Sequence, residues 1–361
     1  MKRMRVAIAG LRRGETFLRV LRTMPDVEVI GLADPDQERR VHARSLLPAG
    51  SNADEADSLA ALLGTDPPPD LVVLATPPIG RVADAVAALE RGIHVLSEIP
   101  AAWTVEECDE LLAAVEASTG TYMLAENALY WGFVDAARRM RHAGEFGRIF
   151  YAEAEMMQDM RSILRDSSGA PTWRLQRTDP ITYCTHSLGP LLSITGQYPT
   201  EVTCMGTGGS FDEPEIHDVQ TALLRLTDGA LVRLTVSLAN AHWHGHRFAL
   251  FGTEASLDTG WVWLDRPRLW SERIPHLAAP VEVPLGTDMP DAPAAAAASG
   301  VATMNWMMMR DLLDALREGR PPRVDIYDAL MFSLPGLLAA QSARAGGARI
   351  AIPQYQLRRA E

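Results

Sequence analysis

Short apolar runs alternate with helical patterns along the first third of the chain, and this alternation constrains the fold more than any other feature. Val27–Ala33 has the length of a strand, and Leu71–Ala75 is apolar throughout, as in a parallel strand buried on both faces. A helical pattern follows each run, and one of these helices opens with a capping box that begins at Thr104. Repeated strand–helix units predict an α/β domain with a doubly wound parallel sheet, the Rossmann arrangement, over residues 1–125.

The pattern changes in the rest of the chain. Ile149–Met157 is a long extended run, and two further extended runs flank Asp228-Gly229, a pair typical of a hairpin turn. Trp261–Leu264 also has the composition of a strand. These features predict a second domain, residues 126–361, of α+β type with a large, mostly antiparallel open sheet, and leave room for its C-terminal segment to return to the first domain.

Net charge and residue composition indicate which partners, location and proton-transfer groups to expect. A net charge of −12 argues against nucleic acid or an anionic membrane as a partner. The three cysteines are not spaced as a zinc site or a disulfide framework, so we predict a reducing, cytoplasmic location. Lys2 is the only lysine. Because arginine stays protonated in proteins, proton transfer inside the fold must use other groups.

The turn after the first strand, Gly10-Leu11-Arg12-Arg13-Gly14, predicts a dinucleotide site. Glycines there allow a tight turn and let the backbone approach a pyrophosphate at a helix N-terminus, although Arg12 replaces the second glycine of the usual pattern. Asp34 follows Gly10 by 24 residues, where an acid binds ribose hydroxyls and repels a 2′-phosphate. We predict NAD as the cofactor, with NADP as the open alternative because of the two arginines. The other interpretation of Asp34 is a turn residue before Pro35.

Two more segments follow strands of the same predicted sheet. Thr76-Pro77 comes after one strand, and Ser97-Glu98-Ile99-Pro100 ends the next. Ligands of open α/β sheets bind beyond the carboxyl ends of the strands. We therefore expect Thr76, Pro77 and Glu98 to contact the cofactor.

At Glu98-Ile99-Pro100 the chain begins to resemble the Gfo/Idh/MocA family of oxidoreductases, which includes glucose–fructose oxidoreductase and inositol dehydrogenase. That family carries Glu-Lys-Pro here, and its lysine assists hydride transfer, whereas this chain has Ile99. Ala125-Glu126-Asn127 is similar to the family's segment near the nicotinamide, which implies a cofactor contact for Asn127. Phe146–Ile149 and Gly319–Asp325 are similar to the family's entry to its second domain and its C-terminal return.

Within that family, the chain is most similar to the branch that contains the NAD-dependent α-N-acetylgalactosaminidases. Its run Tyr183-Cys184-Thr185-His186-Ser187-Leu188-Gly189-Pro190 resembles that branch's Tyr-Pro-Thr-His-Gly-Leu-Gly-Pro. Trp173-Arg174 matches a Trp-Arg pair, and Met157–Arg161 matches an Ile-His-Asp-Leu-Arg run in part.

The resemblance implies a catalytic role for His186, and histidine titrates near neutral pH, where it can take a hydroxyl proton. Tyr183 shares that role or orients the sugar. We expect substrate contacts from five further residues: Arg161, Trp173, Arg174, Tyr130 and His246.

His242, His244 and His246 alternate along one segment, and on a strand they would share a face. Three imidazoles on one face can bind zinc, but no acidic residue lies near them in sequence. We therefore prefer substrate contact or a solvated sheet face and predict no metal site.

The predicted activity is NAD(P)-dependent transfer of a hydride between the nicotinamide and a ring hydroxyl of a sugar, glycoside or cyclitol. The alternative is redox-neutral glycoside cleavage by oxidation, elimination, hydration and reduction at the same site, which the absence of the family lysine favours. A third interpretation is a non-catalytic protein that binds NAD or a sugar. A sheet covered by helices on one face leaves an apolar face to bury, so we predict a homodimer or homotetramer.

Overall fold

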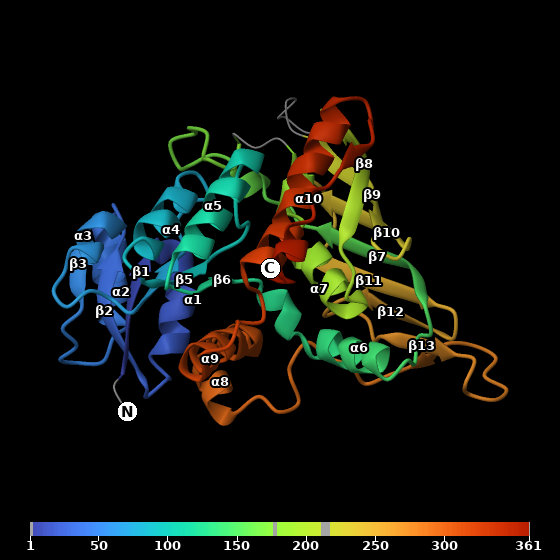
Figure 1. Ribbon diagram of the computed structural model, residues 1–361, viewed down its shortest axis with the longest axis horizontal. Helices are drawn as coiled ribbons and strands as arrows, with labels where there is room; N and C mark the ends of the chain where they lie inside the picture. The colour runs from blue at the N-terminus through green and yellow to red at the C-terminus, as the bar shows by residue number, and fades with distance from the viewer. Residues whose placement is uncertain (1–2, 176–178, 211–216, 361) are drawn as a thin grey trace. The chain divides into compact units, whose positions relative to one another are not determined.

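The protein forms two compact units, each built on its own sheet, in a computed structural model that describes residues 3–175, 179–210 and 217–360. The first unit contains the described residues up to Asn127 together with Pro290–Leu330. The second contains Ala128–Met289 and the described residues from Met331 onward. Figure 1 shows the helices and strands of both units.

The first unit is a parallel sheet of six strands in the order β3-β2-β1-β4-β5-β6. This order confirms the predicted Rossmann arrangement, and it reverses direction between β1 and β4, where such sheets bind their ligands. The strands are β1 Met4–Ala9, β2 Val27–Ala33, β3 Asp54–Ala56, β4 Leu71–Leu74, β5 His94–Ser97 and β6 Tyr122–Leu124. The helices are α1 Leu11–Leu21, α2 Gln37–Ser45, α3 Leu59–Leu63, α4 Arg81–Leu89, α5 Val105–Ala117, α8 Ala294–Ala298 and α9 Thr303–Glu318.

Local sequence explains why these elements begin and end where they do. The predicted capping box is present, because the Thr104 hydroxyl accepts from the Glu107 N–H and the Glu107 carboxylate accepts from the Thr104 N–H. Helix α9 ends at Gly319, whose φ of 64° is the left-handed conformation that favours glycine. The strands β4 and β5 are buried along nearly their whole length, as their apolar composition predicts.

The segment Pro290–Leu330 comes from the C-terminal part of the chain, for which the sequence left room to return to the first domain. In the structure it belongs to the first unit, where α9 lies against α1. The Trp306 indole N–H donates to the Thr23 hydroxyl at 3.1 Å, and Arg310 pairs with Asp26 at 2.8 Å. These contacts join positions far apart in sequence, so no local pattern marks them.

The second unit is a sheet of nine strands in the order β14-β13-β12-β11-β7-β10-β9-β8-β15. Among the strands of the described residues, only the β7–β10 pair is parallel, which confirms the predicted, mostly antiparallel sheet. The strands are β7 Ile149–Met157, β8 Pro199–Gly208, β9 His217–Leu226, β10 Leu231–Ser237, β11 Gly245–Gly252, β12 Ala255–Trp261, β13 Arg268–Ser271, β14 Val281–Glu282 and β15 Ile350–Ala351. The remaining helices are α6 Gly132–His142, α7 Thr185–Thr195 and α10 Ile326–Arg344, with the 3₁₀ turns η1 Asn127–Tyr130, η2 Arg161–Ile163, η3 Pro180–Tyr183 and η4 Tyr355–Ala360.

The two faces of this second sheet differ sharply. On β7, Ala152, Ala154 and Met156 are buried on the face that α7 contacts. Glu153 and Glu155 point to the opposite face, as alternation along a strand requires.

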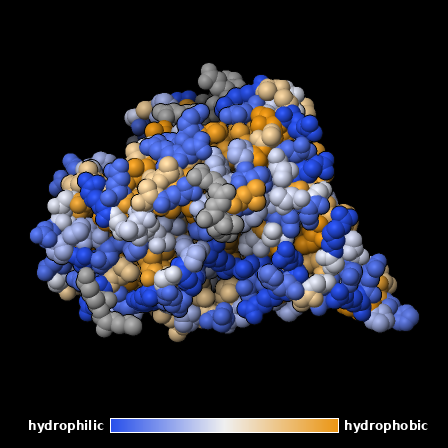
Figure 2. Space-filling model, viewed as in Figure 1, coloured by the Kyte–Doolittle hydropathy of each residue, from blue (hydrophilic) through white to orange (hydrophobic). Residues whose placement is uncertain are grey.

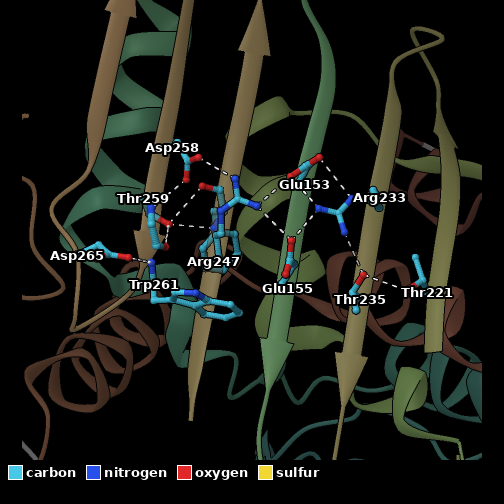
Figure 3. A network of polar contacts seen from close by, with 12 residues as sticks. Glu153, Glu155, Thr221, Arg233, Thr235, Arg247, Asp258, Thr259, Trp261 and Asp265 are labelled. Carbon is cyan, nitrogen blue, oxygen red and sulfur yellow. Dashed lines mark hydrogen bonds and ion pairs between the residues drawn. The ribbon is translucent and has the colours of Figure 1, made fainter. Parts of the chain in front are cut away.

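The opposite face, which the sequence led us to expect to be apolar, carries a network of ion pairs. Arg233 on β10 bridges both carboxylates of β7 at 2.8 and 2.7 Å, and Arg247 on β11 pairs with the same two and with Asp258 (Figure 3). This face is mixed, because its outward positions hold glutamate and arginine beside the partly exposed Tyr151, Phe251 and Leu223.

One predicted strand is also wrong. Strand β12 ends at Trp261, and the chain turns where Trp261–Leu264 was expected to continue as a strand. The N–H groups of Leu264 and Asp265 both donate to the Trp261 carbonyl. Trp263 has a φ of 74°, which is found in turns and not in strands. The aromatic residues of this segment therefore lie in a turn.

The visible surface in Figure 2 shows hydrophobic residues in small patches among hydrophilic ones. In the part of the chain that the structure describes, none of the helices combines the length and the apolar character needed to cross a membrane. Cys108, Cys184 and Cys204 are all buried free thiols.

Candidate functional site

In the first unit, Gly10 stands at the point where the order of the strands reverses. Its φ is 84°, and a Cβ atom there would lie 2.5 Å from backbone atoms of Ala75 and Thr76. Gly14 lies one turn later in α1, where a Cβ would lie 2.8 Å from the Ile8 side chain. These glycines therefore bring α1 against the sheet, as a pyrophosphate site at a helix N-terminus requires.

Asp34 directly follows β2 and is fixed against the start of α1. Its Oδ2 accepts from the Leu11 N–H at 2.8 Å and its Oδ1 from the Asp36 N–H at 3.0 Å. A carboxylate at a helix N-terminus is stabilised by the helix dipole, and each oxygen keeps a second lone pair. The arrangement fits the ribose hydroxyls of a dinucleotide, although Asp34 also has the turn role before Pro35 that the sequence allowed.

The two arginines of the glycine turn have different environments. Arg12 is exposed, whereas the Arg13 Nε donates to Glu98 at 2.6 Å. The other oxygen of Glu98 accepts from the Ile99 N–H at 3.2 Å. The structure thus brings together two predicted cofactor residues, and it buries Ile99 where the family carries lysine.

Arg81, in the first turn of α4, joins two strand-end segments that the sequence marked separately. It is 3% exposed and donates to the carbonyls of Thr76 at 2.9 Å and Pro100 at 2.5 Å. Pro77, beside Thr76, is exposed. Sequence reasoning missed Arg81 because an arginine in a first helical turn carries no signal of burial.

Asn127 follows β6, and the structure ties it to the returning segment. Its side-chain amide donates to the Asn305 Oδ1 on α9 at 2.9 Å, and both residues are buried. Sequence reasoning missed Asn305, which lies 178 residues further along the chain. The polar groups at this edge of the first unit fit an NAD site.

In the second unit, Tyr183 and His186 lie where the turn η3 leads into α7. Their ring centroids are 6.0 Å apart, with the rings nearly perpendicular. His186 is in the first turn of α7.

Buried polar groups of β9 and of the segment before η3 hold the η3 turn in place. The Gln220 amide accepts from the Ile181 N–H at 3.1 Å and donates to the Asp179 carboxylate at 2.9 Å. The Asp179 carboxylate also pairs with Arg344 of α10. This support fixes the turn that carries Tyr183.

His246, on β11, completes a cluster of rings with these residues. Its centroid is 6.1 Å from that of His186 and 5.3 Å from that of Trp131. Burial lowers its pKa well below 6.5, and His186 and His244 lower it further. The imidazole is therefore neutral at physiological pH. Three of the predicted residues, Tyr183, His186 and His246, are thus brought together.

The three alternating histidines do not share one strand face, because β11 begins only at Gly245. The His242 ring lies 4.7 Å from Trp261, while His244 lies 6.0 Å from His246. Partial burial lowers the pKa of His244, and His186 lowers it further. Among the residues that the structure describes, His, Cys, Asp and Glu form no group suited to holding a metal ion.

The other predicted substrate residues have their own contacts. Arg161 binds the Asp159 carboxylate at 2.8 and 2.7 Å and the Asn240 carbonyl at 3.3 Å. The Arg174 guanidinium lies 4.3 Å from the Trp173 ring centroid.

Tyr130 is buried, so its place among the substrate contacts stays a prediction. Sequence reasoning missed two tryptophans of the ring cluster, Trp131 and Trp263. Trp131 directly follows the predicted Tyr130, which was the one available signal.

Comparison with known proteins identifies relatives over most of the chain. A curated glycosyl hydrolase family 109 protein from Solibacter usitatus is 29% identical over 314 residues, covering 79% of this chain and 71% of that protein. An α-N-acetylgalactosaminidase from Bacteroides fragilis is 26% identical over 325 residues, covering 79% of this chain and 75% of the relative. These relatives belong to the branch that the Tyr183–Pro190 run resembles.

Solved structures share the fold. An oxidoreductase domain protein from Kribbella flavida superposes with a TM-score of 0.84 at 20% identity, covering 98% of this chain and all of that one. A levoglucosan dehydrogenase, solved with NADH and levoglucosan, superposes with a TM-score of 0.81 at 18% identity and the same coverage.

Two family descriptions match consecutive parts of the chain. Residues 4–126 match the oxidoreductase family with an NAD-binding Rossmann fold, and residues 134–258 match the C-terminal domain of the same family. The chain belongs to the Gfo/Idh/MocA family of oxidoreductases, and its first unit is that family's NAD-binding Rossmann fold.

Proposed function

We propose that the protein oxidises a ring hydroxyl of a sugar, glycoside or cyclitol with NAD, and that His186 accepts the hydroxyl proton. The observation that carries the proposal is the ring cluster of the second unit, in which His186 lies beside Tyr183 and the neutral His246. When bound, NAD supplies the acceptor for the hydride that leaves the carbon of that hydroxyl.

The roles of the second-unit residues follow from proton chemistry. Removing the hydroxyl proton raises electron density on the carbon that releases hydride, so a base must be near that oxygen. Lys2 is the only lysine, and Ile99 is buried where the family lysine would stand. Histidine is the remaining side chain suited to this step near neutral pH, and the Tyr183 phenol orients the sugar or shares the proton.

Cofactor contacts are proposed for residues of the first unit. The start of α1, at Leu11, Arg12 and Arg13, would hold the pyrophosphate, with Gly10 and Gly14 giving it access. Asp34 would accept from ribose hydroxyls and disfavour a 2′-phosphate, so we propose NAD rather than NADP. The strand-end residues proposed to contact the rest of the dinucleotide are Thr76, Pro77, Glu98 and Asn127.

The second candidate function is cleavage of a glycosidic bond without net oxidation. Two observations favour it: the curated relatives are named as glycosidases, and Ile99 replaces the lysine that assists hydride transfer in the rest of the family. Such cleavage needs a second proton to leave the carbon next to the oxidised one, and Tyr183 and His186 are the candidate acceptors.

One assay separates the two functions. The purified chain with NAD is given levoglucosan or para-nitrophenyl N-acetyl-α-galactosaminide, and reduced nicotinamide and nitrophenolate are followed by absorbance. Accumulating reduced nicotinamide supports the dehydrogenase. Nitrophenolate release without it, with solvent deuterium entering the sugar, supports the glycosidase.

His186→Gln is the critical variant in either assay. Loss of the base should lower turnover by a factor of about 100 or more while leaving NAD affinity unchanged. Full activity in this variant contradicts the assignment of the proton-accepting step to His186 in either function.

We also propose that the protein is a homodimer or homotetramer. The uncovered sheet face carries paired arginines and carboxylates beside Tyr151 and Phe251, whose rings stack at 5.5 Å. A face that carries both positive and negative side chains can pair with the same face of a second copy of the chain. Sedimentation velocity at several concentrations checks the assembly state.

A further inference from the structure

Trp263 has a backbone conformation that few bulky residues adopt. Its φ of 74° is in the left-handed region, which normally costs an L-residue of this size and persists only where its surroundings impose it. Here the turn is fixed at both ends. The Trp261 N–H donates to the Asp265 carboxylate at 2.8 Å, and the Trp261 carbonyl accepts from the N–H groups of Leu264 and Asp265.

The Trp263 ring rests on the ring cluster of the second unit. It stacks on His244 at an interplanar angle of 17° and meets the edges of His246 and Trp131, with centroids 6.1, 6.1 and 5.8 Å away. Despite this support, Trp263 is 52% exposed. The turn thus presents a large, rigidly held aromatic ring while keeping much of it uncovered.

The same cluster connects Trp263 to the proposed catalytic group. His246 lies 6.1 Å, centroid to centroid, from both Trp263 and His186. His246 is 4% exposed, and its Nδ1 has no hydrogen-bond partner among the described residues. A buried polar atom without a partner is uncommon in folded proteins, and a ligand that supplies the missing bond is one explanation.

A pyranose ring matches this combination of groups. One of its faces carries C–H bonds, which interact favourably with the electron-rich face of an indole, while its rim carries hydroxyls. The imidazoles of His244 and His246 contact the Trp263 ring, and they offer hydrogen bonds to hydroxyls at its edge. This pairing of an indole face with hydrogen-bonding imidazoles suits a neutral sugar.

We propose that Trp263, supported by His244, is a stacking platform for a neutral pyranose ring whose hydroxyl edge meets His246. The inference rests on the proposed function and deepens it, because it narrows the substrate class to pyranosides. Trp263 would then determine specificity, and its backbone strain would be retained for binding rather than for stability.

Binding measurements test the platform without requiring turnover. The full chain, loaded with NAD, is titrated by calorimetry with levoglucosan and with methyl N-acetyl-α-galactosaminide. Trp263→Ala should weaken the binding of at least one of them about 10-fold, equivalent to about 1.4 kcal/mol, and Trp263→Phe should weaken it less. The matched control is Trp243→Ala, which removes another exposed tryptophan, 60% exposed, and should leave the affinity unchanged.

A second variant separates binding from folding. Glycine adopts positive φ without strain, so the relief of strain should offset part of the lost ring contacts. Trp263→Gly should therefore lower the melting temperature less than Trp263→Ala does, while losing the same affinity. A clear fall in melting temperature with unchanged affinity would show that Trp263 is a structural residue and overturn the proposal.

Three other results also overturn it: wild-type affinity in Trp263→Ala, equal losses in Trp263→Ala and Trp243→Ala, or no binding of either pyranoside by the wild type. Failure of the proposed function gives a different result from failure of the platform. If only the proposed function fails, pyranosides still bind through Trp263, but neither oxidation nor glycoside cleavage depends on His186.

Discussion

The two units hold their candidate residues by opposite means. In the first, charged groups are tied to the main chain or to each other: Asp34 to the start of α1, Arg13 to Glu98, and Arg81 to two carbonyls. In the second, the candidate residues are mostly rings in edge-on and stacked contact, and the buried imidazole among them is neutral.

The contrast matches the ligands that we propose for the two units. A dinucleotide is charged and the same in every turnover, so fixed polar groups at a glycine turn suit it. A neutral sugar offers one apolar face and a rim of hydroxyls, so aromatic rings with imidazoles beside them suit it. Changes in the first unit should therefore act on NAD binding, and changes in the ring cluster should act on the sugar and on proton transfer.

The largest predicted effect is that of Gly10→Ala. The new Cβ would meet the backbone of Ala75 and Thr76 at 2.5 Å, so we expect stability to fall by about 2–4 kcal/mol and NAD affinity to fall at least about 10-fold. Gly50→Ala is the matched control, because Gly50 has the same φ of about 85° with no atom within 4 Å. It should cost about 1 kcal/mol and leave NAD binding intact, as read by denaturant unfolding and calorimetry. Equal effects of the two variants would remove the steric argument for the turn.

Arg81→Met should have the next largest effect. It leaves the carbonyls of Thr76 and Pro100 without their charged donor, at a cost of about 2–3 kcal/mol in the free energy of unfolding. NAD affinity should also fall, because Arg81 no longer joins the two strand-end segments. Arg81→Lys keeps the charge, so its NAD affinity and its stability should lie between those of Arg81→Met and the wild type. Unchanged NAD affinity in an otherwise folded Arg81→Met protein would show that the tie has no bearing on the cofactor.

The third predicted effect is the contribution of His246, in the second unit, to the pH dependence of the free energy of unfolding. The pKa of His246 is lower in the folded protein than in the unfolded chain, so the unfolded chain takes up a proton first as the pH falls below 6.5. The contribution of His246 is therefore present above pH 6.5 and is lost at about 1.4 kcal/mol per pH unit below it.

His246→Phe should reduce this slope by about one proton. The slope should not vanish, because burial also lowers the pKa of His94 in the first unit. Denaturant unfolding at several pH values below 6.5 measures the slope, and an unchanged slope in His246→Phe would mean that this imidazole is not held neutral.

The smallest predicted effect lies on the open face of the second sheet. Burial tends to raise the pKa of Glu153, but hydrogen bonds from Arg233 and Tyr151 lower it overall. At concentrations where the chain is monomeric, Glu153→Gln should cost about 0.5–1 kcal/mol, less at high salt, because the side chains of Arg233 and Glu153 are 30% and 15% exposed. A loss that salt does not reduce would contradict the description of these pairs as partly solvated.

Local patterns predicted much of the first unit and little of the ring cluster. The bounds of β2, the position of β4 and the capping box at Thr104 followed from the sequence, because buried parallel strands are apolar runs and caps are local. Gly10 and Asp34 were likewise marked by their spacing.

The residues that were missed depend on long-range contacts or on unusual backbone. Asn305 meets Asn127 only because the chain returns to the first unit, and Arg81 gains its role from two separate loops. Trp263 was misread as part of a strand, since aromatic composition favours strands and does not reveal a positive φ.

We propose that the first unit binds NAD and that the second accepts the proton. This claim is tested most directly by measuring NAD affinity and turnover in His186→Gln. We expect the variant to bind NAD within about twofold of the wild type and to lose at least about 100-fold in turnover of the sugar substrate. Turnover close to that of the wild type, with NAD still bound, would contradict the assignment of the proton-accepting step to the second unit.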